Sequence, residues 1–209
     1  PVLVHAYPDK VDSLSISTRR DSFCGKMSVC NNLVQYGIPF SITTLHTVDP
    51  DSASFRADVD KFAAVCRIVN GLRKARFGQV GARPAAFITV RYSEKLLEQA
   101  GISVESADLS EIFSASNRLA DDDAAVTAKL AEIKAYLKVG DTPADALVKM
   151  AKFGVALDNF IAAHDLDGTA VQCWTSMEEN YGVVPCTIMS MLSNSLVPSA
   201  CETDITGLI

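Results

Sequence analysis

The residues best suited to chemistry are acids that follow two predicted strands near the end of the chain. Glu178 and Glu179 come shortly after one apolar run, and Glu202 and Asp204 follow the next. Because successive parallel strands present their carboxyl ends at one edge of a sheet, these acids are placed to converge. Gathered carboxylates suit a hard divalent cation, Mg²⁺ or Mn²⁺, or a general acid/base pair. Spacing alone, however, favours the simpler alternative, in which all four acids are solvated loop residues.

A second candidate is Arg83, in a Gly-Ala-Arg-Pro loop that directly follows a predicted strand. An arginine at a strand end can donate paired hydrogen bonds to a carboxylate, phosphate or sugar oxygen. A surface arginine in a proline turn explains the same residues equally well. We predict Arg83 and Trp174, which precedes the acids, as substrate contacts. The chain has no GxGxxG or Walker spacing and no HExxH or Cys/His zinc spacing, so neither a nucleotide motif nor a zinc motif is supported.

Short β-like runs alternate with longer helical patterns, which is typical of parallel α/β units. The predicted strands span residues 2–7, 39–45, 76–80, 86–90, 102–106, 170–174 and 196–201. The predicted helices span residues 22–36, 52–75, 93–100, 108–117, 121–137, 143–164 and 184–192. The apolar pattern of the 143–164 helix predicts burial on most sides. The order predicts an α/β protein with open, mostly parallel sheets flanked by helices, in Rossmann-like domains.

The pattern predicts a domain boundary near residue 50, where one strand–helix–strand unit is complete. A second boundary is predicted near Pro198. Residues 1–50 would then be the end of an N-terminal α/β domain, 51–197 a central α/β domain, and 198–209 the start of a truncated C-terminal domain. The apolar final residues end in the middle of a pattern, which predicts a fragment of a larger multidomain chain.

Composition limits the classes of function. The chain has 209 residues, of which 48% are hydrophobic and 21% charged, as in a packed globular protein. It contains no apolar run of the roughly 20 residues that span a bilayer. The net charge of −6 and the scattered basic residues argue against nucleic acid as a partner. Six cysteines without a CxxC pair, and no signal-like start, predict a reduced, cytoplasmic protein without a membrane partner.

Three segments resemble those of the L-fucose isomerase and L-arabinose isomerase superfamily, particularly its fucose-isomerase-like members. The first, with the Arg83 loop, resembles the entry to the family's central domain. The second resembles the segment that carries the family's first metal-binding glutamate, and the third resembles the segment that supplies a second acidic ligand. The segments are residues 72–92, 164–182 and 198–207.

The resemblance implies a chemistry and assigns residues to it. Members interconvert aldoses and ketoses through a cis-enediol, using Mn²⁺ or a similar ion that binds the substrate's O1 and O2. Carried onto this chain, Glu178 is the implied first ligand, and the second is either Glu202 or Asp204. Glu178 and Asp204 are the implied catalytic acids that move protons between C1, C2 and their oxygens.

The family's site also needs a histidine ligand from a C-terminal domain, and this chain offers no such domain. We therefore expect the 209 residues alone to be inactive, and the full-length protein to be a homo-oligomer that binds a monosaccharide. Two other functions remain open. The chain would be a sugar- or metabolite-binding α/β module without catalysis, or a structural or oligomerisation domain whose acids are solvated.

Overall fold

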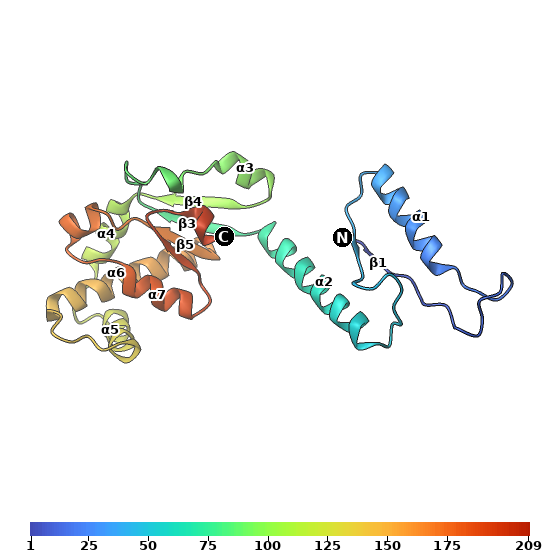
Figure 1. Ribbon diagram of the computed structural model, residues 1–209. Coiled ribbons are helices and arrows are strands. Elements are labelled where there is room, and N and C mark those ends of the chain that lie inside the picture. Colours follow the sequence, from blue (N-terminus) through green and yellow to red (C-terminus); the bar gives the residue numbers. More distant parts are fainter. The chain divides into compact units, whose positions relative to one another are not determined.

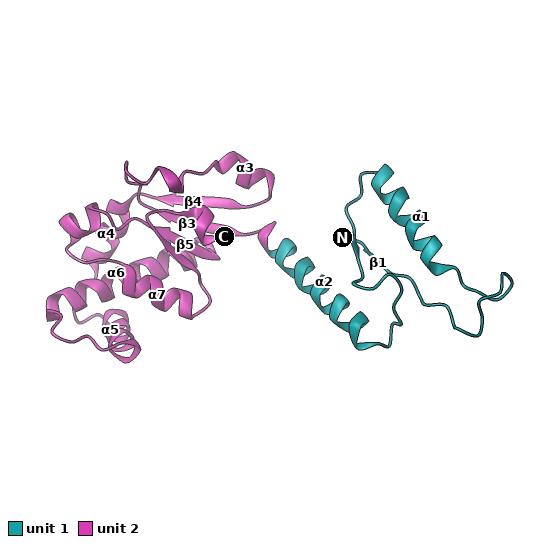
Figure 2. Cartoon of the chain, viewed as in Figure 1, with its two compact units in different colours: residues 1–71 teal, residues 72–209 magenta.

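The computed structural model describes residues 1–209 and contains two compact units, residues 1–71 and residues 72–209 (Figures 1 and 2). The division falls at the end of a long helix, because that helix is tied to the segment before it. Asp58 on the helix accepts hydrogen bonds from Thr44, and Phe55 packs against the ring of His5. The domain boundaries predicted near residue 50 and Pro198 stay predictions.

Unit 1, residues 1–71, alternates short parallel strands with helices. Its elements are β1 (Leu3–Val4), α1 (Ser22–Gln35), β2 (Ser41–Ile42) and α2 (Ala53–Leu72). Gly37, with φ of 64°, ends α1 in the left-handed conformation that favours glycine. The buried Lys26 on α1 donates to Thr43 Oγ1 at 2.9 Å and to the carbonyl of His46 at 3.0 Å, which fixes the chain after β2.

Unit 2, residues 72–209, is built on one four-stranded parallel sheet. Its strands are β3 (Arg76–Val80), β4 (Ser103–Ala107), β5 (Gly168–Val171) and β6 (Ser199–Cys201), in the order β4-β3-β5-β6. The chain runs from β3 to β4 on one side and then returns to β5 on the other side of β3. The topological switch point, where ligands bind in open α/β sheets, therefore lies between the ends of β3 and β5.

Helices cover this sheet and form its main core. They are α3 (Glu94–Gln99), α4 (Leu109–Arg118), α5 (Ala124–Tyr136), α6 (Ala144–His164), α7 (Cys186–Asn194) and the short α8 (Ile205–Leu208). The predicted burial of α6 is confirmed, since Phe153 and Leu157 are fully buried and α4 and α5 pack against it. The predicted α/β class with parallel sheets flanked by helices is likewise confirmed. No helix is both long enough and apolar enough to cross a membrane.

The predicted strand at 86–90 is wrong. Ile88–Val90 is a single 3₁₀ turn, and Ile88 is exposed. The segment pairs with no strand: β3 is flanked by β4 and β5, and residues 86–90 do not join the sheet at the outer edge of β4 or of β6. The strand predicted at 170–174 ends at Val171, which leaves Trp174 in the loop beyond it. Pro143 is the N-cap of α6 rather than its first helical residue.

Candidate functional site

Three loops meet at the carboxyl edge of the unit 2 sheet, after β3, β5 and β6. At the switch point, the backbone N–H of Ala82 donates to Oε1 of Gln172 at 2.8 Å. Gly81 has φ of 88°, and a Cβ there would lie 2.5 Å from the same Gln172 oxygen, so only glycine allows this approach. The loop after β3 is thereby joined to the loop after β5.

Glu202, just after β6, is the central acid of this edge. It is 7% exposed, and its Oε1 accepts hydrogen bonds from Cys173 Sγ at 2.7 Å and from the Trp174 backbone N–H at 3.1 Å. Its other carboxylate oxygen, Oε2, is buried and accepts no hydrogen bond. Leaving a buried carboxylate oxygen without a partner is costly, and a bound cation would satisfy it.

The backbone at this point is also unusual. Glu202 and Thr203 have φ of 54° and 59°, a conformation that side-chain-bearing residues seldom adopt. Both are buried, at 7% and 2% exposure. Strain of this kind costs of order 1–3 kcal/mol per residue and occurs mainly at functional sites. The turn after β6 thus holds Glu202 in the interior of the edge.

Asp204 is used differently from Glu202. Its Oδ1 accepts the Gly207 backbone N–H at 2.8 Å and the Thr206 hydroxyl at 3.2 Å, and so caps α8. The sequence left Glu202 and Asp204 as alternatives for the second ligand. In the structure Asp204 is engaged in a helix cap, whereas Glu202 keeps a buried oxygen that accepts no hydrogen bond.

Glu178 lies on a short π-helical turn, Met177–Tyr181. Met177 and Tyr181 are buried and anchor the turn, whereas Glu178 and Glu179 are exposed. Such turns are rare and occur often at functional sites. The metal-ligating atoms that lie within 4.8 Å of one another belong to Cys173, Cys201 and Glu202, and neither Glu178 nor Asp204 is in that group.

Of the two predicted substrate contacts, Arg83 lines a cavity of about 520 Å³ beside the turn at Thr203, and Trp174 does not. Arg83 and the buried Thr203 both line it, which brings the loops after β3 and β6 together. The Arg83 guanidinium donates to the carbonyl of Pro84 at 2.9 Å and is folded onto its own loop. Trp174 is 46% exposed and packs edge-on against Phe87, with ring centroids 5.3 Å apart.

Tyr92 supplies a polar group on the wall of this cavity. Its hydroxyl donates to Gln79 Oε1 at 2.5 Å and lies 3.4 Å from Glu94 Oε1. Burial, together with the charge of Glu94, raises the pKa of Tyr92 to about 12. The hydroxyl therefore stays protonated at neutral pH, and its proton is the one donated to Gln79.

Two cysteines complete the edge, and sequence reasoning missed them. Cys173 Sγ and Cys201 Sγ are 3.4 Å apart, on chain segments that follow or end neighbouring strands. Burial, with a smaller contribution from the hydrogen bond to Glu202, raises the pKa of the Cys173 thiol, and burial also raises the pKa of Cys201. The only signal in the sequence was that Cys201 directly precedes Glu202.

Comparison with known proteins places this edge in context. The family described as fucose/sulfoquinovose isomerase, N-terminal domain, matches residues 1–73. Sulfoquinovose isomerases of Priestia aryabhattai and Priestia megaterium are each 26% identical over 193 residues, which is 91% of this chain and 42% of theirs. That of a Clostridium species is 26% identical over 164 residues, covering 77% of this chain and 36% of its own.

These matches make the chain similar to sugar isomerases, and the parallel α/β fold agrees with that similarity. More particularly, the similarity is to fucose/sulfoquinovose isomerases, which confirms the fucose-isomerase-like resemblance inferred from the sequence. The chain spans 42% of the length of the Priestia relatives.

Proposed function

We propose that this chain is the part of a metal-dependent aldose–ketose isomerase that carries the acidic half of its metal site. The observation that carries the proposal is the buried, unpartnered Oε2 of Glu202, held in place by a strained turn. A divalent cation at that oxygen, Mn²⁺ or a similar ion, would polarise the two substrate oxygens at C1 and C2. The sulfoquinovose isomerase activity of the relatives supports an isomerase of monosaccharides.

In this proposal Glu202, rather than Asp204, is the second metal ligand. Asp204 already accepts two hydrogen bonds within its helix cap. If its Oδ1 bound a metal instead, the Gly207 N–H and the Thr206 hydroxyl at the start of α8 would lose their acceptor. Glu178 remains the proposed first ligand and the proposed base. As an exposed carboxylate on the π-helical turn, it is accessible to a substrate proton at C2.

The remaining residues of the edge would position the sugar. Arg83 and Tyr92 line the 520 Å³ cavity. The Arg83 guanidinium can donate hydrogen bonds to hydroxyl oxygens, and the Tyr92 oxygen, whose proton is donated to Gln79, can accept one. The exposed Trp174 ring offers an apolar face of the kind that packs against a sugar ring.

Isomerisation moves one proton between C2 and C1 through a cis-enediol, while a second proton moves between the oxygens on those two carbons. The resemblance implies that a histidine outside these 209 residues completes the site, in a full-length, homo-oligomeric, cytoplasmic enzyme.

Mn²⁺ titration followed by electron paramagnetic resonance tests the ligand assignment. We expect Glu202→Gln and Glu178→Gln each to weaken Mn²⁺ binding at least about 10-fold, since even outer residues of metal sites contribute about 10–100-fold. The matched controls are Asp204→Asn, which keeps an oxygen for the α8 cap, and Glu179→Gln, next to Glu178. Both should bind within about 3-fold of the unchanged chain. Equal affinity in Glu202→Gln would sink the assignment.

Turnover assays test the activity. The purified 209-residue chain should not interconvert L-fucose, L-arabinose or sulfoquinovose with their ketoses, because the implied histidine ligand is outside it. Robust turnover by this chain would overturn that expectation. Sugar binding that persists without Mn²⁺ and in Glu178→Gln would instead support the sugar- or metabolite-binding module.

A further inference from the structure

The thiols beside Glu202 form a cluster that the isomerase chemistry does not use. Cys173 Sγ lies 3.4 Å from Cys201 Sγ and 2.7 Å from Glu202 Oε1, and Cys201 Sγ lies 3.6 Å from the same oxygen. All three side chains are at least partly buried, and Glu202 has an orphaned second oxygen. Two sulfurs and a carboxylate thus share one small volume at the sheet edge.

The spacing of these atoms suits a tetrahedral ion. Tetrahedral zinc holds sulfur at about 2.3 Å and oxygen at roughly 2.0–2.2 Å, which places ligand atoms on the order of 3.4–3.8 Å apart. The sulfur–sulfur distance of 3.4 Å and the Cys201–Glu202 distance of 3.6 Å already fall in that range. Only the Cys173–Glu202 contact, a hydrogen bond at 2.7 Å, has to open as the thiol proton leaves.

We propose that Cys173, Cys201 and Glu202 bind a thiophilic divalent cation, of which Zn²⁺ is the common example, with a fourth position left for water. On binding, each thiol gives its proton to solvent and its sulfur forms a bond to the metal, so one Zn²⁺ replaces two protons. Thiolate sulfur selects Zn²⁺ over Mn²⁺, which prefers oxygen ligands. This site is distinct from the proposed Mn²⁺ site, but it draws on the same glutamate.

Sharing Glu202 has a consequence for the two ions. If Zn²⁺ binds Glu202 Oε1 together with the two sulfurs, the carboxylate gives part of its negative charge to Zn²⁺. Its other oxygen, Oε2, then binds a hard cation such as Mn²⁺ more weakly. Thiophilic metal at the cysteines should therefore weaken Mn²⁺ binding at Glu202. This consequence rests on the proposed function, whereas the thiol site itself does not.

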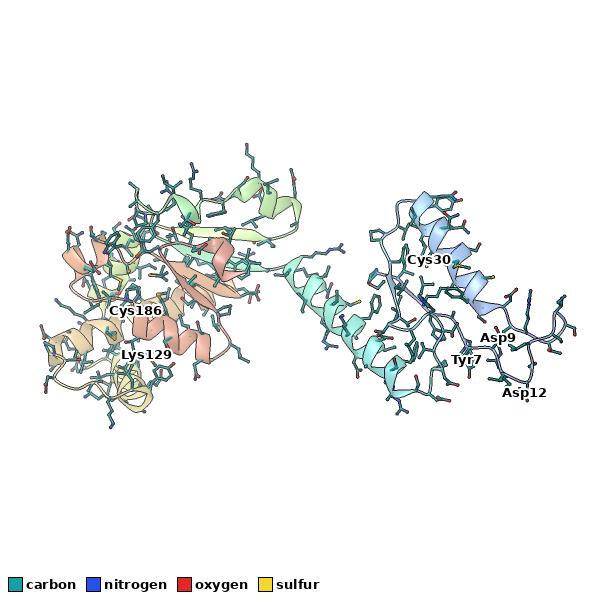
Figure 3. All side chains as sticks on the ribbon, in the orientation of Figure 1. Tyr7, Asp9, Asp12, Cys30, Lys129 and Cys186 are labelled. Carbon is teal, nitrogen blue, oxygen red and sulfur yellow. The ribbon has the colours of Figure 1, made fainter.

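The test uses a background chain from which the other thiols have been removed by substitution with serine. The four thiols removed are Cys24, Cys30, Cys66 and Cys186, and none of them belongs to the cluster. Three of them lie in unit 1, as Figure 3 shows for Cys30 on α1, and the fourth, Cys186, is the first residue of α7. Under reducing conditions, Cd²⁺ titration should give one equivalent with ultraviolet sulfur-to-metal charge-transfer absorption. Zn²⁺ should displace it, and Mn²⁺ should not.

Single substitutions in that background then identify the ligands. Cys173→Ser, Cys201→Ser and Glu202→Gln should each weaken Zn²⁺ binding at least about 10-fold, as loss of a metal-site residue does. Zn²⁺ affinity within about 3-fold of the background in both cysteine variants overturns the proposal. Weak Mn²⁺ binding with an intact Zn²⁺ site would contradict the proposed function alone, so the two failures are separable.

X-ray absorption at the zinc edge removes any dependence on how the variants fold. The background chain with one equivalent of Zn²⁺ should show two sulfur ligands at about 2.3 Å and oxygen ligands at roughly 2.0–2.2 Å. A first shell made only of oxygen and nitrogen would overturn the assignment, whatever the affinity.

Discussion

The two units differ in how far their apolar side chains are covered. In unit 2, α6 contributes fully buried residues to a continuous core, among them Phe153 and Leu157. In unit 1, α2 has no buried residue and α1 buries only Lys26. Most of the exposed large apolar side chains of the chain belong to unit 1, although it is the smaller of the two.

The units also divide the functional information. The matched family segment, residues 1–73, coincides almost entirely with unit 1, whereas the orphaned carboxylate and the thiol pair lie in unit 2. The match to the family model thus falls in the unit with little core of its own, and the proposed metal ligands fall in the unit with a dense core. A strained turn such as that at Glu202 and Thr203 needs a rigid surrounding, which unit 2 provides.

The largest expected effect tests the difference in core. Phe153→Ala should destabilise unit 2 by about 3–5 kcal/mol, because a fully buried ring is lost and a cavity remains. The matched change Phe23→Ala, at a side chain 39% exposed in unit 1, should cost under about 1 kcal/mol. Hydrogen exchange with mass spectrometry measures both, and urea unfolding followed by Trp174, the one tryptophan, reports unit 2. Equal costs would break the comparison.

A glycine pair gives an effect of intermediate size and opposite sign. Gly101 has φ of +87°, and a Cβ there would collide with the carbonyl oxygen of Arg73, so Gly101→Ala should cost about 1–3 kcal/mol. Gly25 lies in α1, and a methyl group added there would have no heavy atom within 4 Å beyond its own turn of helix. Gly25→Ala should therefore stabilise α1 by about 0.5–1 kcal/mol. A loss of α1 protection from hydrogen exchange in Gly25→Ala would mean that unit 1 is more tightly packed there than the structure indicates.

The smallest effect concerns acid sensitivity and is expected in both units. Hydrogen bonds from Thr44 lower the pKa of Asp58 in unit 1, and hydrogen bonds from Ser110 lower that of Asp108, the N-cap of α4, in unit 2. A folded-state pKa below the unfolded value gives stability that is present above the unfolded pKa and is lost as pH falls through the folded one.

The corresponding variants are Asp58→Asn and Asp108→Asn. Each should be less stable than the unchanged chain at pH near 6, and the difference should shrink below about pH 4, where aspartate protonates in unfolded chains. Urea unfolding at a series of pH values, read by Trp174 for Asp108→Asn and by hydrogen exchange for Asp58→Asn, measures it. A difference that stays constant with pH would contradict the role of the ionised carboxylates.

The sequence predicted the parts of the fold that depend on local pattern. β3 and α6 were found with nearly their observed bounds, and for α6 the apolar helical face is a local signal. The strand expected at 86–90 failed because a strand also needs a partner, and residues 86–90 pair with no strand of the sheet. No local pattern contains that information.

The site was predictable only in part for the same reason. The acids near the chain end were identified from the sequence. Glu178 and Asp204 lie outside the group of close ligand atoms around Glu202, so the convergence of these acids on one ion stays a prediction. The burial of Glu202 and the capping role of Asp204 depend on the backbone conformation of one short turn. Amino-acid composition does not predict that conformation. The contact between Cys173 and Cys201 joins residues 28 positions apart and is created by the pairing of β5 with β6.

The pairing of β3 with β5 also affects how the chain folds during its synthesis on the ribosome. Arg76 and Asp167, which hydrogen-bond to each other at this seam, lie 91 positions apart, whereas β4 reaches the other edge of β3 much sooner. At about 5–20 residues per second of synthesis, one edge of β3 stays open for roughly 5–20 s on the ribosome. During that interval an unpaired strand can join a strand of another nascent chain. The long helical insertion before β5 therefore makes the timing of translation, and any chaperone that shields β3, part of what determines the yield of folded protein.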